Sequence, residues 1–125
     1  MKKKPISPHL QIYRPQITTV LSIMHRFTGV GLVIGIILFT IAFASFASAE
    51  SAWKSFIKIW HLSGGSIWQW GLIFSLHYHV FNGIRHLAWD TGYGFELKDV
   101  VQSGFAVLIL SIIATLAFAH FCSII

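Results

Sequence analysis

Three long stretches without a charged side chain dominate the pattern of hydrophobic and polar positions along the chain. Residues 27–49, 59–84 and 100–125 contain no Asp, Glu, Lys or Arg. A helix needs about 20 apolar residues to cross the roughly 30 Å hydrocarbon core of a bilayer, and each stretch is long enough. Helices are favoured because backbone groups in lipid must be satisfied within the segment, and three strands cannot close a barrel. The pattern predicts transmembrane helices near residues 24–49, 59–84 and 100–123.

Composition supports an integral membrane protein with one domain over residues 1–125. Hydrophobic residues make up 55% of the chain and charged residues 10%, against about 25% charged in an average soluble domain. A disordered chain would be poor in apolar residues, and a disulfide scaffold is excluded because Cys122 has no partner in the chain. We expect an all-α fold, a three-helix transmembrane bundle preceded by an extended N-terminal arm at residues 1–20. Three prolines within the arm prevent a continuous helix there.

Lysine and arginine predict the orientation in the membrane. Seven of them would lie on the N-terminal side and only Lys54 and Lys58 on the other. The positive-inside rule then places the N-terminus in the cytoplasm and the C-terminus in the periplasm. The net charge of +5 is explained by this topology, so no nucleic-acid partner is expected. No Arg- and Ser-rich transit peptide precedes the first span, and the apolar run is too long for a cleaved signal peptide. We expect a bacterial inner (plasma) membrane, or the mitochondrial inner membrane if the chain is organelle-encoded.

Polar residues inside the predicted spans are candidate sites because they are costly in lipid. His79 lies about 9 Å inside the inner end of the second span at 1.5 Å per residue. His86 follows on the same face, with Asn82 on the same stripe, and Gly83 leaves a gap for a helix or a flat ligand. Imidazole in a dry bundle suits axial ligation of haem iron. The alternative is a histidine hydrogen-bonded to a neighbouring helix.

Cationic groups near the aqueous edge would suit haem propionates, and four residues lie there: His25, Arg26, Arg85 and His86. No second histidine of this chain is expected at the depth of His79. His77 is about 200° around the helix, and His25 is about 10 Å shallower by helical rise. A haem with two histidine ligands would therefore take its second histidine from another chain.

A second candidate site opens the first span. Ser22 and Arg26 are spaced i, i+4 and share one helix face. A hydroxyl and a guanidinium at the membrane boundary could hold the oxygens of a quinone. Without further knowledge, the spacing favours the plainer interpretation, an arginine that extends to lipid phosphates.

Three segments together resemble the cytochrome b subunit of succinate dehydrogenase, the larger membrane-anchor subunit of respiratory complex II. They are residues 7–13, 22–29 and 79–90, and they include the patterns S-x-x-H-R-x-[ST]-G and H-x-x-x-G-x-R-H-x-x-x-D. The resemblance implies an anchor that docks a flavoprotein subunit and an iron–sulfur subunit on the membrane. Succinate would be oxidised at FAD in a partner subunit, and electrons would pass through iron–sulfur clusters to ubiquinone.

The resemblance also implies roles for individual residues. His79 matches an axial ligand of haem b, with the other histidine supplied by a second membrane-anchor subunit. Ser22 and Arg26 match the family's quinone site. His25 and His86, with Arg26, match groups near the haem propionates, and Asp90 matches the motif aspartate. Arg85 and Asp90 are kept as supporting residues, and no residue of this chain is expected to be catalytic.

Several alternatives remain open from the sequence. One is a structural anchor without haem. Another is a small proton- or ion-conducting subunit that uses His79, Asn82 and Arg85 as a relay. A dihaem anchor of a fumarate reductase would need more buried histidines and more spans. The chain has no cluster-binding cysteines and too little polar mass for a dicarboxylate site, so we expect no succinate chemistry in this chain.

Overall fold

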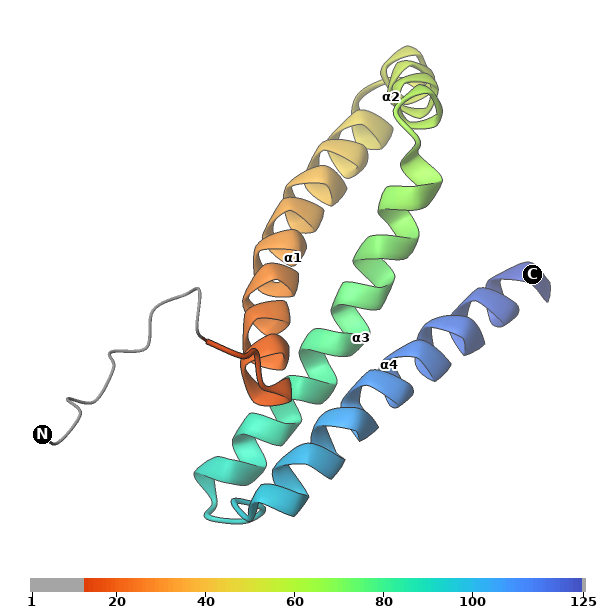
Figure 1. Ribbon diagram of the computed structural model, residues 1–125. Helices are drawn as coiled ribbons and strands as arrows, with labels where there is room; N and C mark the ends of the chain where they lie inside the picture. Colours follow the sequence, from red (N-terminus) through yellow and green to blue (C-terminus); the bar gives the residue numbers. More distant parts are fainter. Residues whose placement is uncertain (1–12, 125) are drawn as a thin grey trace, which may run out of the picture.

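The computed structural model describes residues 13–124, and this part of the chain consists of four helices joined by short connections (Figure 1). They are α1 (Ile17–Ser48), α2 (Glu50–Leu62), α3 (Gly65–Asp90) and α4 (Leu97–Ile124). Helices α1 and α3 run side by side in opposite directions, and α4 packs along the other side of α3. Most of the predicted arm lies outside the described residues; Tyr13–Gln16 precede α1 in non-helical conformation.

The prediction of an all-α fold is confirmed, whereas the three-helix bundle is confirmed only in part. By length and composition, α1 and α4 are apolar enough to cross a membrane. Helix α3 is 26 residues long, which corresponds to about 39 Å at 1.5 Å per residue. Its polar residues make it less apolar than α1 and α4, and it is not among the described helices that are apolar enough to cross a membrane by composition alone.

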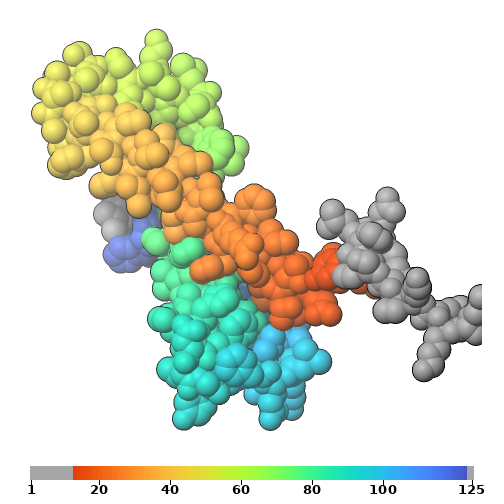
Figure 2. Space-filling model, turned by 90° about the vertical axis from the view of Figure 1, so that its left-hand side faces the viewer, coloured from red at the N-terminus to blue at the C-terminus, as the bar shows by residue number. Residues whose placement is uncertain are grey.

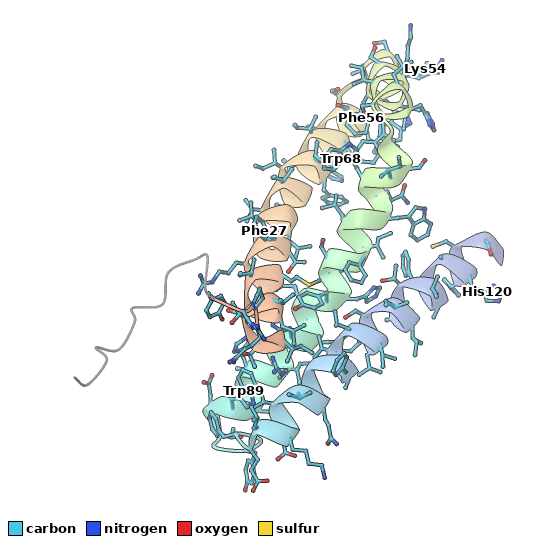
Figure 3. The ribbon with its side chains drawn as sticks, in the orientation of Figure 1. Phe27, Lys54, Phe56, Trp68, Trp89 and His120 are labelled. Carbon is cyan, nitrogen blue, oxygen red and sulfur yellow. The ribbon has the colours of Figure 1, made fainter. Side chains whose placement is uncertain are left out.

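The fourth helix, α2, was not predicted and occupies residues expected to form a loop and the start of the second span. It is amphipathic: Trp53, Phe56 and Trp60 line a space shared with α1 and α3, while Lys54 pairs with Glu50 at 2.6 Å on the exposed side. Figure 3 shows Lys54 at the end of the bundle, pointing away from it. An aromatic face opposite a charged face is typical of a helix that lies in the membrane interface.

Helix α3 lies six residues later than the predicted second span, 59–84: its start follows α2, and its end was misplaced because Arg85 was read as the end of the helix. Arg85 is instead 7% exposed, and α3 continues past it to Asp90. Its guanidinium Nε donates to the Ser103 hydroxyl and Nη2 donates to the Val100 carbonyl, both at 2.9 Å. A guanidinium whose donors are hydrogen-bonded to α4 can lie between two packed helices. The charge of Arg85 therefore does not mark the end of α3.

The buried core is small and lies where the start of α1, the second half of α3 and the start of α4 meet. It consists of Leu21, Tyr78 and Val107, and the Tyr78 hydroxyl donates to the Leu21 carbonyl at 2.8 Å. At Gly104, an added Cβ would lie 2.6 Å from Leu21 Cδ1. The missing side chain therefore permits the close approach of α1 and α4.

Most large apolar side chains of the described residues face outwards. Phe27 is 73% exposed and Phe39 is 72% exposed, and Figure 3 shows Phe27 pointing away from α3. The space-filling view shows α1 lying across this face, with the end of α3 and the start of α4 extending beyond it (Figure 2). Soluble monomers rarely expose contiguous apolar surface of this extent, so this surface is suited to lipid or to other subunits.

Candidate functional site

Three histidines gather on the faces of α1 and α3 that meet near the buried core. His25 lies on α1, and His79 and His86 lie on α3. The rings of His25 and His79 are stacked, with centroids 3.9 Å apart and planes 9° apart. The His86 ring lies 5.4 Å from His25 and edge-on to Trp89 at 5.0 Å. The predicted grouping of these residues at one end of the bundle is therefore present.

The predicted depth of His25 is wrong. His25 is not shallower than His79 but lies directly against it. The error comes from the helix bounds: α1 begins at Ile17 rather than near residue 24, and α3 ends at Asp90 rather than near residue 84. Face-to-face rings do not point their nitrogens at one common atom, so this stack is not a pair of axial ligands to one iron.

The hydrogen bonds of His79 specify its tautomer. Its Nδ1 lies 3.2 Å from the His25 carbonyl oxygen. A carbonyl can only accept, so Nδ1 carries the proton, an assignment that follows from the hydrogen-bond network. The Thr28 hydroxyl donates to the same carbonyl at 2.9 Å, and its oxygen lies 3.3 Å from Nδ1. In a neutral imidazole with this tautomer, Nε2 is the nitrogen that can bind a metal.

The surroundings of the His79 ring fit a large planar group. An added Cβ at Gly83 would meet nothing within 4 Å in the described chain, so this side of α3 is open next to the histidine face. In the same region, the buried Nδ1 of His25 has no hydrogen-bond partner among the described residues. A ligating imidazole whose second nitrogen donates to a carbonyl is the usual arrangement at metal centres. The donor set of this chain thus fits one axial ligand of a haem.

The quinone candidates lie one helical turn apart on α1, at the same end of the bundle as the three histidines. Ser22 is half-buried and Arg26 is exposed. Arg26 lies on the exposed side of α1, and no hydrogen bond or ion pair joins it to residues 13–124. Asp90 is the last residue of α3 and is also exposed.

Asn82 and Arg85 face away from the His79 contacts. Arg85 Nη1 donates to Asn82 Oδ1 at 3.3 Å, and the guanidinium lies 4.0 Å from the Trp89 ring centroid. Asn82 therefore belongs to a buried stripe with Tyr78 and Arg85, not to the histidine stripe as predicted. Among the described residues, Asn82 contacts Arg85 but His79 is hydrogen-bonded to neither, so the relay of His79, Asn82 and Arg85 is not continuous. Arg85 instead joins α3 to α4.

His77 also contacts α4: its Nδ1 lies 3.1 Å from the Thr115 hydroxyl. It packs between the helices on the side away from His79. A pocket of about 490 Å³ lies elsewhere, towards α2. Its lining is almost entirely apolar and includes none of the predicted site residues.

Thr28, whose hydroxyl contacts His79, was not predicted as a site residue, although it is the seventh position of the motif S-x-x-H-R-x-[ST]-G.

The fold and this cluster define a class: a helical membrane protein with histidines packed inside its bundle. Comparison with known proteins specifies the family. Residues 1–118 match the model of the succinate dehydrogenase/fumarate reductase transmembrane subunit. The chain belongs to this family of membrane subunits of respiratory complex II.

Named relatives cover most of the chain. The succinate dehydrogenase cytochrome b556 subunit of Rickettsia prowazekii is 41% identical over 118 residues, which cover 91% of this chain and 89% of the relative. The mitochondrial succinate dehydrogenase cytochrome b560 subunits of Sus scrofa and Homo sapiens are 36% and 35% identical, over 93% of this chain and 70% of each relative. The resemblance drawn from the motifs is thereby confirmed.

Proposed function

We propose that this chain is the haem b-binding membrane-anchor subunit of a succinate:ubiquinone oxidoreductase, which works in the citric acid cycle and the respiratory chain. The observation that carries the proposal is the 3.2 Å contact between His79 Nδ1 and the His25 carbonyl oxygen on α1. This contact leaves Nε2 for an iron atom. The names of the relatives, cytochrome b556 and b560 subunits, support the same cofactor.

In this proposal His79 supplies one axial ligand, and a second membrane-anchor subunit supplies the other histidine. His25, Arg26 and His86 lie at the end of the bundle where the propionates of such a group would need cationic or donor partners. Haem b, when bound, takes up and releases single electrons. The residues of this chain bind it, orient it and shield it from water, with Arg85 holding α3 in place against α4.

Ser22 and Arg26 form this chain's half of the quinone site. The Arg26 guanidinium is a fixed positive charge with directed donors, so it would bind one quinone oxygen and stabilise negative charge that develops there on reduction. The Ser22 hydroxyl would hydrogen-bond an oxygen of the same ligand. Asp90, exposed at the end of α3, would support the same site. Protons would arrive from the cytoplasmic side through partner subunits.

Succinate oxidation belongs to the partners in this proposal: FAD and the iron–sulfur clusters lie in the flavoprotein and iron–sulfur subunits, which this chain docks on the membrane. As a single anchor domain it spans the bilayer with α1, α3 and α4. The N-terminus is cytoplasmic and the C-terminus periplasmic in a bacterial inner membrane. The exposed apolar side chains of α1 and α4 support this burial in lipid and against the second anchor.

A reduced-minus-oxidised visible spectrum of the detergent-purified complex tests the haem assignment. The wild type should show a sharp low-spin b-type band that is lost or shifted in His79→Ala. His77→Asn is the matched control, because its amide can replace the contact to Thr115 while His79 stays intact. A wild-type complex with all subunits but no haem band would reject the proposal. An equal change in both variants would reject the ligand assignment.

A further inference from the structure

We propose that Thr28 and Gly29 are positioning residues for the His79 ring, and that the Thr28 hydroxyl helps to determine the properties of the haem that His79 would bind. The inference rests on the proposed function, because it describes how this chain holds its own ligand. Both residues lie on α1, one turn beyond His25: the Thr28 hydroxyl contacts Nδ1 of the imidazole, and Gly29 lies against its Cε1 edge.

The hydroxyl makes two contacts that act together. Thr28 donates its single proton to the His25 carbonyl at 2.9 Å, so its oxygen can only accept from His79 Nδ1 at 3.3 Å. The Nδ1 proton is thus shared between two acceptors, the hydroxyl oxygen and the carbonyl oxygen at 3.2 Å. Two acceptors restrict rotation of the ring more than one acceptor does. Thr28 is 8% exposed, so water does not readily replace its hydroxyl.

Gly29 provides the steric half of the arrangement. A Cβ added there would lie 3.1 Å from His79 Cε1 and 3.7 Å from Nδ1. The first distance is tighter than ordinary van der Waals contact, so a side chain at this position would displace the ring. The glycine therefore allows the ring to lie against α1, where the two acceptors reach Nδ1.

The consequence is electronic as well as geometric. A hydrogen bond from the distal nitrogen makes an imidazole a stronger electron donor and orients its plane. A stronger donor favours ferric over ferrous iron. Removal of the Thr28 hydroxyl should therefore raise the midpoint potential of the haem and alter the low-spin ferric EPR signal, which depends on the orientation of the axial imidazole.

The experiment compares Thr28→Val, Thr28→Ser and wild type in the purified complex. Valine keeps the shape and removes the hydroxyl, whereas serine keeps the hydroxyl. The readouts are the midpoint potential from redox titration and the EPR spectrum, together with haem content per complex. We expect a positive shift and an altered signal in Thr28→Val only. Gly29→Ala should change the EPR signal while leaving the hydroxyl in place.

Each other outcome has a defined meaning. A Thr28→Val complex with the wild-type potential and EPR signal overturns the inference, and so does a Thr28→Ser complex that shifts as much as Thr28→Val. If Thr28→Val does not assemble, Thr28→Ala provides the same comparison without a branched side chain. Failure of both while Thr28→Ser assembles would show a general structural role and overturn the specific one. Absence of haem from the wild type would instead reject the proposed function itself.

Discussion

Replacement of Arg85 by methionine tests the account of how α3 and α4 are held together. Methionine has a similar length and is apolar, but it has no donor for the Ser103 hydroxyl, the Val100 carbonyl or the Asn82 amide oxygen. It also removes the cation that lies 4.0 Å from the Trp89 ring. Asn82 Nδ2 is already buried without a partner in the described chain, so the variant would leave both ends of this amide unsatisfied.

The expected cost follows from these contacts. The two hydrogen bonds that join Arg85 to α4 contribute about 0.6 kcal/mol each by the average for bonds between membrane helices, so their loss costs roughly 1 kcal/mol. The cation–π contact adds about 0.5–1 kcal/mol, and the unsatisfied amide oxygen adds about 1–3 kcal/mol. The total is about 3–5 kcal/mol. Arg85→Lys keeps the charge but lacks the planar fork of donors, so its cost should be intermediate.

The assay is thermal loss of the b-type absorbance band from the intact complex in detergent. Arg85→Met should lower the apparent midpoint by roughly 5–10 °C, with a smaller decrease for Arg85→Lys. Lys98→Met is the control, since Lys98 is an exposed cation at the start of α4 and its loss should change little. A melting curve of Arg85→Met that coincides with wild type would refute the view that this buried arginine joins the two helices.

Three further predictions concern other parts of the molecule. Arg26→Leu should reduce succinate:quinone reductase activity by about 10²-fold while leaving dye-linked succinate oxidation intact, and normal quinone turnover would reject the quinone assignment. Gly104→Ala forces a Cβ towards Leu21 and should destabilise the complex by about 1–3 kcal/mol in a denaturation assay. Gly71→Ala is the control and should leave the stability unchanged, because a Cβ there meets nothing within 4 Å. Cys122 is exposed near the end of α4, so a membrane-impermeant maleimide should label it in intact spheroplasts, and labelling only in inverted vesicles would contradict the predicted topology.

The sequence was sufficient for the features that depend on composition and local spacing. Long uncharged stretches predict helices because a bilayer core tolerates few charges and no unpaired backbone. The i, i+7 spacing of His79 and His86 predicts a shared face. The three motifs were sufficient for the family, because their residue types and spacings occur together in one order. The bounds of the helices were less well predicted, since the ends were placed at charged residues.

Only the tertiary structure decided which residues meet across helices. Arg85 is a charge in sequence, but in the fold its guanidinium donates hydrogen bonds to a hydroxyl and a carbonyl oxygen of α4, and α3 runs on to Asp90. That shift places His25 against His79 rather than nearer the surface. The Thr28 hydroxyl and the His25 carbonyl reach His79 across more than 50 residues of sequence. Local spacing cannot specify such contacts, because they depend on the relative height and rotation of two helices that packing alone determines.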